Sequence, residues 1–83
     1  MKWSVSLLAE GDRVLELAEI VELADAVAPL NGIASGMGTA TYGAQILVEA
    51  ASSDEAVEIA LPLFVRAAEQ AGLPLWPVTR AEV

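Results

Sequence analysis

Hydrophobic and polar residues alternate at the start of the chain. Within residues 2–8, Trp3, Val5 and Leu7 are apolar and the residues before and between them are polar. A period of two is typical of a strand that buries one face. We therefore expect a strand over residues 2–8.

The spacing of apolar residues then changes to three and four, which is the spacing of a helix. Asp12 is the expected N-cap, because an aspartate side chain can accept a hydrogen bond from the first free backbone N–H groups. Pro29 cannot continue a helix. We expect this first helix to run from about Asp12 to about Ala28.

Turn residues and two extended segments follow. Asn31-Gly32 is typical of a turn. We expect a short strand over Ile33–Met37, a connection over Gly38–Ala40 and a second strand over Thr41–Ala50. One face of that second strand is apolar and carries Tyr42, Ala44, Ile46 and Val48. The pattern predicts a hairpin.

A second helix is predicted between Ser52 and Gly72. Ser52 and Glu55 have the spacing of a capping box at the start of the helix. Gly72 is expected to end it, because glycine readily adopts the left-handed backbone conformation found after helices. Pro62 lies within this helix among charged positions, so we expect one helix bent around the core, with a break into two helices as the alternative. The opposite side is an apolar stripe of Val57, Ala60, Phe64, Ala67 and Ala71.

A last strand is expected over Leu73–Ala81. Pro77 within it has no N–H to donate, so this strand should lie at a sheet edge. The order β-α-β-β-α-β predicts a ferredoxin-like α+β fold, in which a four-stranded antiparallel sheet carries both helices on one face. Residues 1–83 are then a single domain with the first and third strands at its centre.

Composition narrows the classes of partner. The 83 residues are 55% apolar and carry 12 acidic against 4 basic side chains, a net charge of −8. Binding to nucleic acid or to an anionic membrane requires clustered lysine and arginine, so we expect neither partner. No apolar run approaches the roughly 20 residues that span a bilayer. The N-terminal residues do not resemble a secretory signal, which favours a cytoplasmic protein.

The chain contains no histidine and no cysteine. It therefore lacks the usual general base, the thiol nucleophile and the commonest metal ligands, and we expect neither an enzyme nor a bound cofactor. The acidic residues of the first helix recur every third position and so spiral around it instead of converging on a metal. The glycine-rich segment 32–39 lacks the lysine of a phosphate-binding loop, which favours a turn and a twisted edge strand.

Three segments of the C-terminal half form a pattern: Tyr42–Ala50, Asp54–Val57 and Ala71–Val78. Together they resemble small proteins of actinobacteria and their phages. The resemblance implies a small cytoplasmic βαββαβ domain without an assigned activity. The first helix and the segment Gly32–Thr41 depart from that pattern.

The first helix has more apolar surface than a sheet can cover. One arc holds Val14, Leu17, Val21, Ala24 and Ala28, and a second arc, about 100° away, holds Ile20, Leu23 and Val27. The second arc is the candidate interface, and it packs either on the neighbouring helix or on another chain. The open face of the sheet is the other candidate, with Ser4 and Ser6 beside Gln45 and Leu47.

These features favour a non-catalytic protein-interaction or regulatory module. We expect it to bind a protein partner or itself, as a homodimer or larger assembly. A phage-encoded chain would take a host protein as its partner. The alternative is a small-molecule sensor that binds its ligand at a dimer interface.

Overall fold

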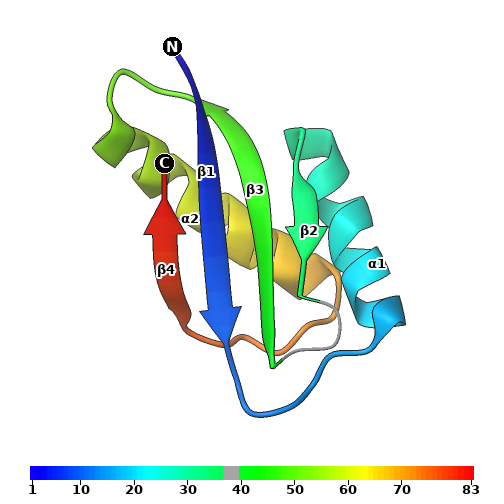
Figure 1. Ribbon diagram of the computed structural model, residues 1–83. Helices are drawn as coiled ribbons and strands as arrows, with labels where there is room; N and C mark the ends of the chain where they lie inside the picture. The colour runs from blue at the N-terminus through cyan, green and yellow to red at the C-terminus, as the bar shows by residue number, and fades with distance from the viewer. Residues whose placement is uncertain (37–39) are drawn as a thin grey trace.

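Four strands and two helices follow one another in the expected order in the computed structural model, which describes residues 1–36 and 40–83 (Figure 1). A short 3₁₀ turn, η1, covers Ala28–Leu30 directly after the first helix. The elements are β1 Lys2–Glu10, α1 Leu17–Val27, β2 Ile33–Ser35, β3 Thr41–Glu49, α2 Ser53–Gln70 and β4 Val78–Glu82. The molecule is thus an α+β fold, as predicted.

The four strands form one antiparallel sheet in the order β2-β3-β1-β4. The two long strands, β1 and β3, pair along their whole length, from Lys2 opposite Glu49 to Glu10 opposite Thr41. The prediction that the first and third strands are central, with the last strand at an edge, is confirmed. β4 pairs with residues 6–9 of β1 only, and an irregularity between Leu8 and Ala9 shifts its register.

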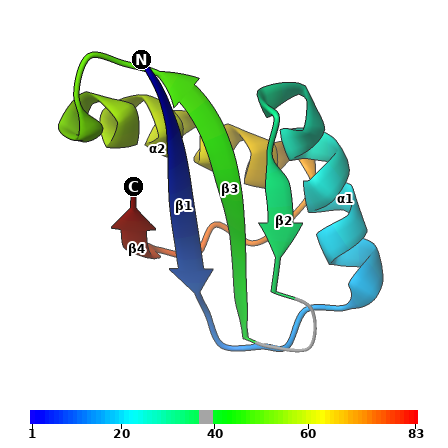
Figure 2. The same cartoon turned by 45° about the horizontal axis from the view of Figure 1, so that its top comes forward.

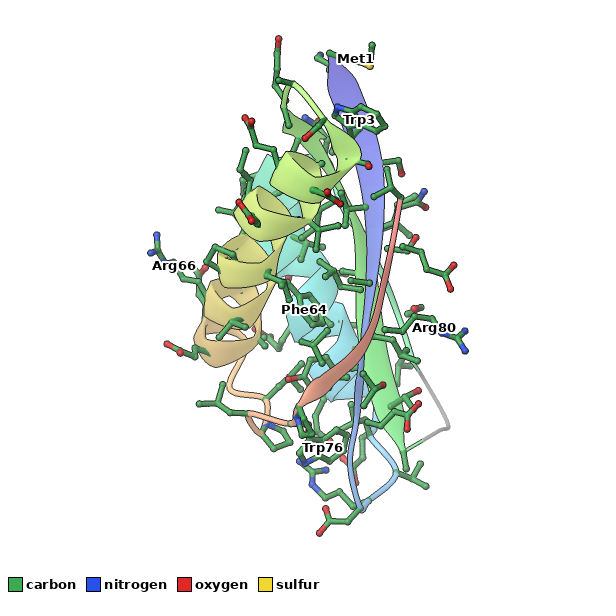
Figure 3. All side chains as sticks on the ribbon, turned by 90° about the vertical axis from the view of Figure 1, so that its left-hand side faces the viewer. Met1, Trp3, Phe64, Arg66, Trp76 and Arg80 are labelled. Carbon is green, nitrogen blue, oxygen red and sulfur yellow. The ribbon has the colours of Figure 1, made fainter. Side chains whose placement is uncertain are left out.

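One hydrophobic core joins the sheet to both helices. Alternate residues of the two central strands point into it, as the period of two predicts, and Val5 and Ile46 are completely buried. Phe64 projects from α2 toward the sheet and is 1% exposed (Figure 3). α1 contributes Ile20, Leu23 and Val27 to the same cluster.

Aromatic side chains fasten the segment before β4 to one end of the sheet. The Tyr42 hydroxyl donates to the Pro74 carbonyl at 2.9 Å, and its ring stacks on Trp76 with 5.6 Å between centroids. Residues 73–77 lie outside the strand, and the Glu10 N–H also holds them by donating to the Pro77 carbonyl at 3.3 Å. The expected strand over Leu73–Ala81 was wrong at its start, because β4 begins at Val78 after Pro77.

The first helix begins later than its sequence suggests. Asp12 is not the N-cap, because α1 starts at Leu17 with Glu16 in the capping position. The link before it instead buries Leu15, which is 1% exposed, and extends Arg13 toward the helix. Both oxygens of the Glu19 carboxylate accept hydrogen bonds from the Arg13 guanidinium, at 2.9 and 2.6 Å. The Glu16 N–H donates to the same carboxylate at 3.1 Å, which secures the first turn.

The second helix is continuous, as expected. It runs through Pro62, which is exposed, and the Ser52 hydroxyl accepts a hydrogen bond from the Glu55 N–H at 3.3 Å. Gly72 ends it with φ of 76°. The buried side is turned slightly from the predicted stripe, since Val57 and Ala71 are half-buried and Ala56 and Ala68 are buried in addition to Ala60, Phe64 and Ala67.

The predicted hairpin is confirmed by the antiparallel pairing of β2 with β3. Asn31 precedes it in the left-handed conformation, with φ of 55°. β2 ends at Ser35, two residues short of the expected Met37. Met37 itself, with Gly38 and Thr39 of the expected connection, lies outside the described residues.

Candidate interaction surface

The apolar arc that the first helix exposes to solvent is not the one named as the candidate interface. Ile20, Leu23 and Val27 are 7%, 0% and 0% exposed, so of the two alternatives for this arc the structure shows packing within the chain. These three branched side chains face the core, where they bury more apolar surface than an arc that contains two alanines would. Their burial follows from packing within the chain.

The other arc of the helix is exposed. Val14 and Leu17 each have 60% of their surface exposed, and Val21 has 48%. Four members of this arc lie on α1 and η1, and we call them the α1 flank: Leu17, Val21, Ala24 and Ala28. At about 100° per residue, they fall within a sector of about 60° on the helix surface.

The α1 flank faces away from the second helix. Ala26, which is about 170° from the centre of the flank, lines a hollow with Leu63 and Ala67 of α2 and is half-buried. The flank must therefore point outward, past the β2 end of the sheet. Figures 1 and 2 show α1 on that side of the molecule, beside β2.

The edge of the sheet beside the flank carries no charge. β2 is the outermost strand, so one of its edges pairs with no strand of the described chain. Its sequence is Ile33-Ala34-Ser35, and the Ile33 side chain is 71% exposed. Exposed edge strands are commonly protected from association by charged side chains or proline, and β2 has neither. Its short length is the one protective feature that it has.

The open face of the sheet brings the other predicted residues together. Ser4 lies opposite Leu47 and Ser6 opposite Gln45, and the Gln45 amide donates a hydrogen bond to the Ser4 hydroxyl. Leu47 is 43% exposed. A hollow of about 320 Å³ opens here, between Ile33 and Ser35 of β2 and, at the other edge, Arg80 and Glu82 of β4. This face is mixed in character, with neutral polar groups at its centre.

Reactive groups do not converge in the described part of the chain. Among residues 1–36 and 40–83, no three Asp or Glu side chains gather in a way that could hold a metal ion. Within the same residues, every buried side-chain nitrogen or oxygen has a hydrogen-bond partner. The apolar flank and the open face are therefore the surface features on which a function can be argued.

The comparisons with known proteins give no relative. No family model, curated protein or solved structure matches the chain. A search of the described helices for a membrane span finds none with sufficient length and apolar character.

Proposed function

We propose that this protein is a non-catalytic interaction module that self-associates through the α1 flank. The observation that carries the proposal is the exposure of Leu17 and Val21 on one sector of a helix whose other apolar arc already fills the core. Its function then depends on which protein covers this surface. It does not depend on a reactive group.

The free energy gained by burying these side chains supports the proposal. Burying an exposed leucine or valine side chain contributes about 1.5–3 kcal/mol. A monomer leaves about half of each side chain in water, so covering them contributes about half of that amount each. The two alanines that follow, Ala24 and Ala28, allow another surface to approach the helix closely. Contiguous exposed apolar residues of this kind mark interaction surfaces on soluble proteins.

We further propose that the fold is ferredoxin-like, with both helices on one face of the sheet. The strand order β2-β3-β1-β4 and the antiparallel pairing of every neighbouring pair support this. So does the single core, in which buried residues of α1 and α2 meet the same faces of β1 and β3. In this arrangement the flank of α1 beside β2 stays uncovered within the chain.

Sedimentation equilibrium tests the self-association. At micromolar concentration we expect a mass of twice 8.6 kDa for the unmodified chain. Leu17→Glu places a charge on the flank and should return the mass to that of one chain. Ala18→Glu is the matched control, because Ala18 is the exposed neighbour about 100° away from Leu17 and should leave the dimer intact. A single-chain mass for the unmodified protein across this range would contradict the proposal.

A second function, the sensing of a small molecule, is favoured by the hollow on the open face. Ser6, Ser35 and Gln45 would offer neutral hydrogen-bonding groups, and the ion pair of Arg80 and Glu82 would offer charges of both signs. A thermal-shift screen tests it, since a ligand at one hundred times its Kd stabilises the fold by about 2.7 kcal/mol. The shift should be lost in Gln45→Ala. A shift that survives this substitution would place the ligand elsewhere.

A further inference from the structure

We infer that the partner at the α1 flank is a second copy of this chain, docked antiparallel across a two-fold axis. In this arrangement Leu17 meets the partner's Ala28, Val21 meets the partner's Ala24, and the two β2 edges lie side by side. The inference rests on the proposed function and specifies its geometry.

The spacing of the flank is the first argument. Its residues are separated by four, three and four positions, a series that reads the same in both directions. Its centre lies between Glu22 and Leu23. When two such flanks run antiparallel about that centre, each large side chain faces an alanine of the other copy. A two-fold interface requires this self-complementarity of a single surface.

The second argument is the position of β2 along the axis of α1. The Gly32 N–H donates to the Val27 carbonyl at 3.0 Å, which fixes where the strand begins relative to the helix. From Gly32 to Ala34 the strand advances about 6.6 Å. Because β2 runs back along α1, the same distance covers four to five helical residues before Val27, at about 1.5 Å each. Ala34, the middle of β2, therefore lies within about one helical turn (5.4 Å) of the centre of the flank.

A single two-fold axis can consequently relate the two α1 flanks to each other and the two β2 edges to each other. An axis through the centre of the flank also passes close to the middle residue of the uncharged β2 edge. Two copies would extend the sheet across β2 while their α1 helices pack above the junction. The two features have independent origins in the sequence, since one is a helical spacing and the other is a strand position.

Charge distinguishes a second copy from a basic partner. Each copy carries a net charge of −8, so like charges oppose the dimer while apolar contact favours it. Salt screens that repulsion, and the dimer should tighten by several-fold when NaCl rises from about 0.05 to about 0.5 M. A complex held by attraction between the acidic surface and a basic partner would weaken over the same range.

Engineered cysteines test the geometry, because the chain has no cysteine of its own. We would make Leu17→Cys and Ala28→Cys separately, give one a mass tag, and oxidise each alone and both mixed. The mixture should form the disulfide-linked heterodimer, whereas each variant alone should form little. Leu17 and the partner's Leu17 would be about 16 Å apart along the helices, and a disulfide needs Cα atoms within about 7 Å.

Ser6→Cys on the open face is the control. Self-linkage of this variant, without linkage in the mixture, would place the interface on the open face and would overturn both the inference and the proposed use of the α1 flank. Linkage of Leu17→Cys to itself would overturn the inference alone, because it indicates parallel flanks. If the unmodified chain sediments as one chain at all concentrations, the proposed function itself fails. The salt dependence of the unmodified dimer tests the inference without any substitution, and weaker association at high salt would contradict it.

Discussion

At the scale of single residues, the end of the sheet near Trp76 is the most tightly constrained place. A Cβ atom added at Gly11 would lie 1.9 Å from the Trp76 indole ring. That ring is stacked on Tyr42 and cannot move aside without losing the contact. The glycine therefore serves close packing against this ring.

Gly11→Ala should destabilise the protein by about 1–3 kcal/mol through this overlap. Urea denaturation measures the loss. In a Trp3→Phe background Trp76 is the one remaining tryptophan, and its fluorescence should show a more exposed ring. Unchanged stability together with unchanged emission would mean that the ring does not pack over Gly11.

The ion pair of Arg13 and Glu19 gives a prediction for pH. Hydrogen bonds from the Arg13 guanidinium, and then from the Glu16 backbone, lower the pKa of Glu19 from 4.5 to about 2. A lowered carboxyl pKa adds stability that is present above about pH 4.5 and is lost as the pH falls toward 2. NMR titration of the Glu19 carboxyl carbon should show this low midpoint, and Arg13→Gln should move it up toward 4.5. An equal midpoint in both proteins would show that the pair does not form.

At the scale of elements, the order and type of the helices and strands were predictable because each has its own period. The alternation in β1 and β3 and the stop at Gly72 are local signals, and both are confirmed. The start of α1 was missed because Leu15 enters the core from an extended link, which no local pattern records. The last strand was predicted to begin too early, because Trp76 is apolar, as a strand residue can be, but packs on Tyr42 outside β4.

The sequence did not determine the rotation of α1 about its own axis. The sequence contains two apolar arcs on this helix, and a period alone does not say which one the sheet will cover. The arc with Ile20, Leu23 and Val27 lies in the core, which leaves the α1 flank outside. The surplus apolar arc was therefore visible in the sequence, but the arc named as the candidate interface is the one that the structure buries within the chain. Ser4, Ser6, Gln45 and Leu47 were placed correctly, because a strand's period fixes which residues share a face.

A pair of alanine substitutions tests this rotation. Leu23→Ala should lower the free energy of unfolding by about 2–5 kcal/mol, since Leu23 is fully buried and its removal leaves a cavity. Val21→Ala, two residues away on the exposed flank, should leave the free energy of unfolding of the isolated chain within about 0.5 kcal/mol. Chemical denaturation at a concentration below dimer formation measures both. Equal losses, or the reverse order, would contradict the assigned rotation.

At the scale of the whole molecule, we propose that the chain is one half of an assembly. The net charge of −8 keeps copies apart at long range, and the uncharged flank and β2 edge are where they can approach. The core holds α1 in place, so the flank is a fixed surface rather than a segment that must order on binding. Two copies joined there would present one continuous open sheet face to further partners.

The most direct test is an NMR measurement of contacts between copies in a dimer made from differently labelled chains. We expect cross-peaks between the Leu17 methyl groups of one copy and the Ala28 methyl group of the other. Within a single copy these groups are about 16 Å apart along the helix, too far for such a contact. Contacts between copies that instead join Leu47 or the Ser6 region, or a dimer without the Leu17 to Ala28 cross-peaks, would contradict the account.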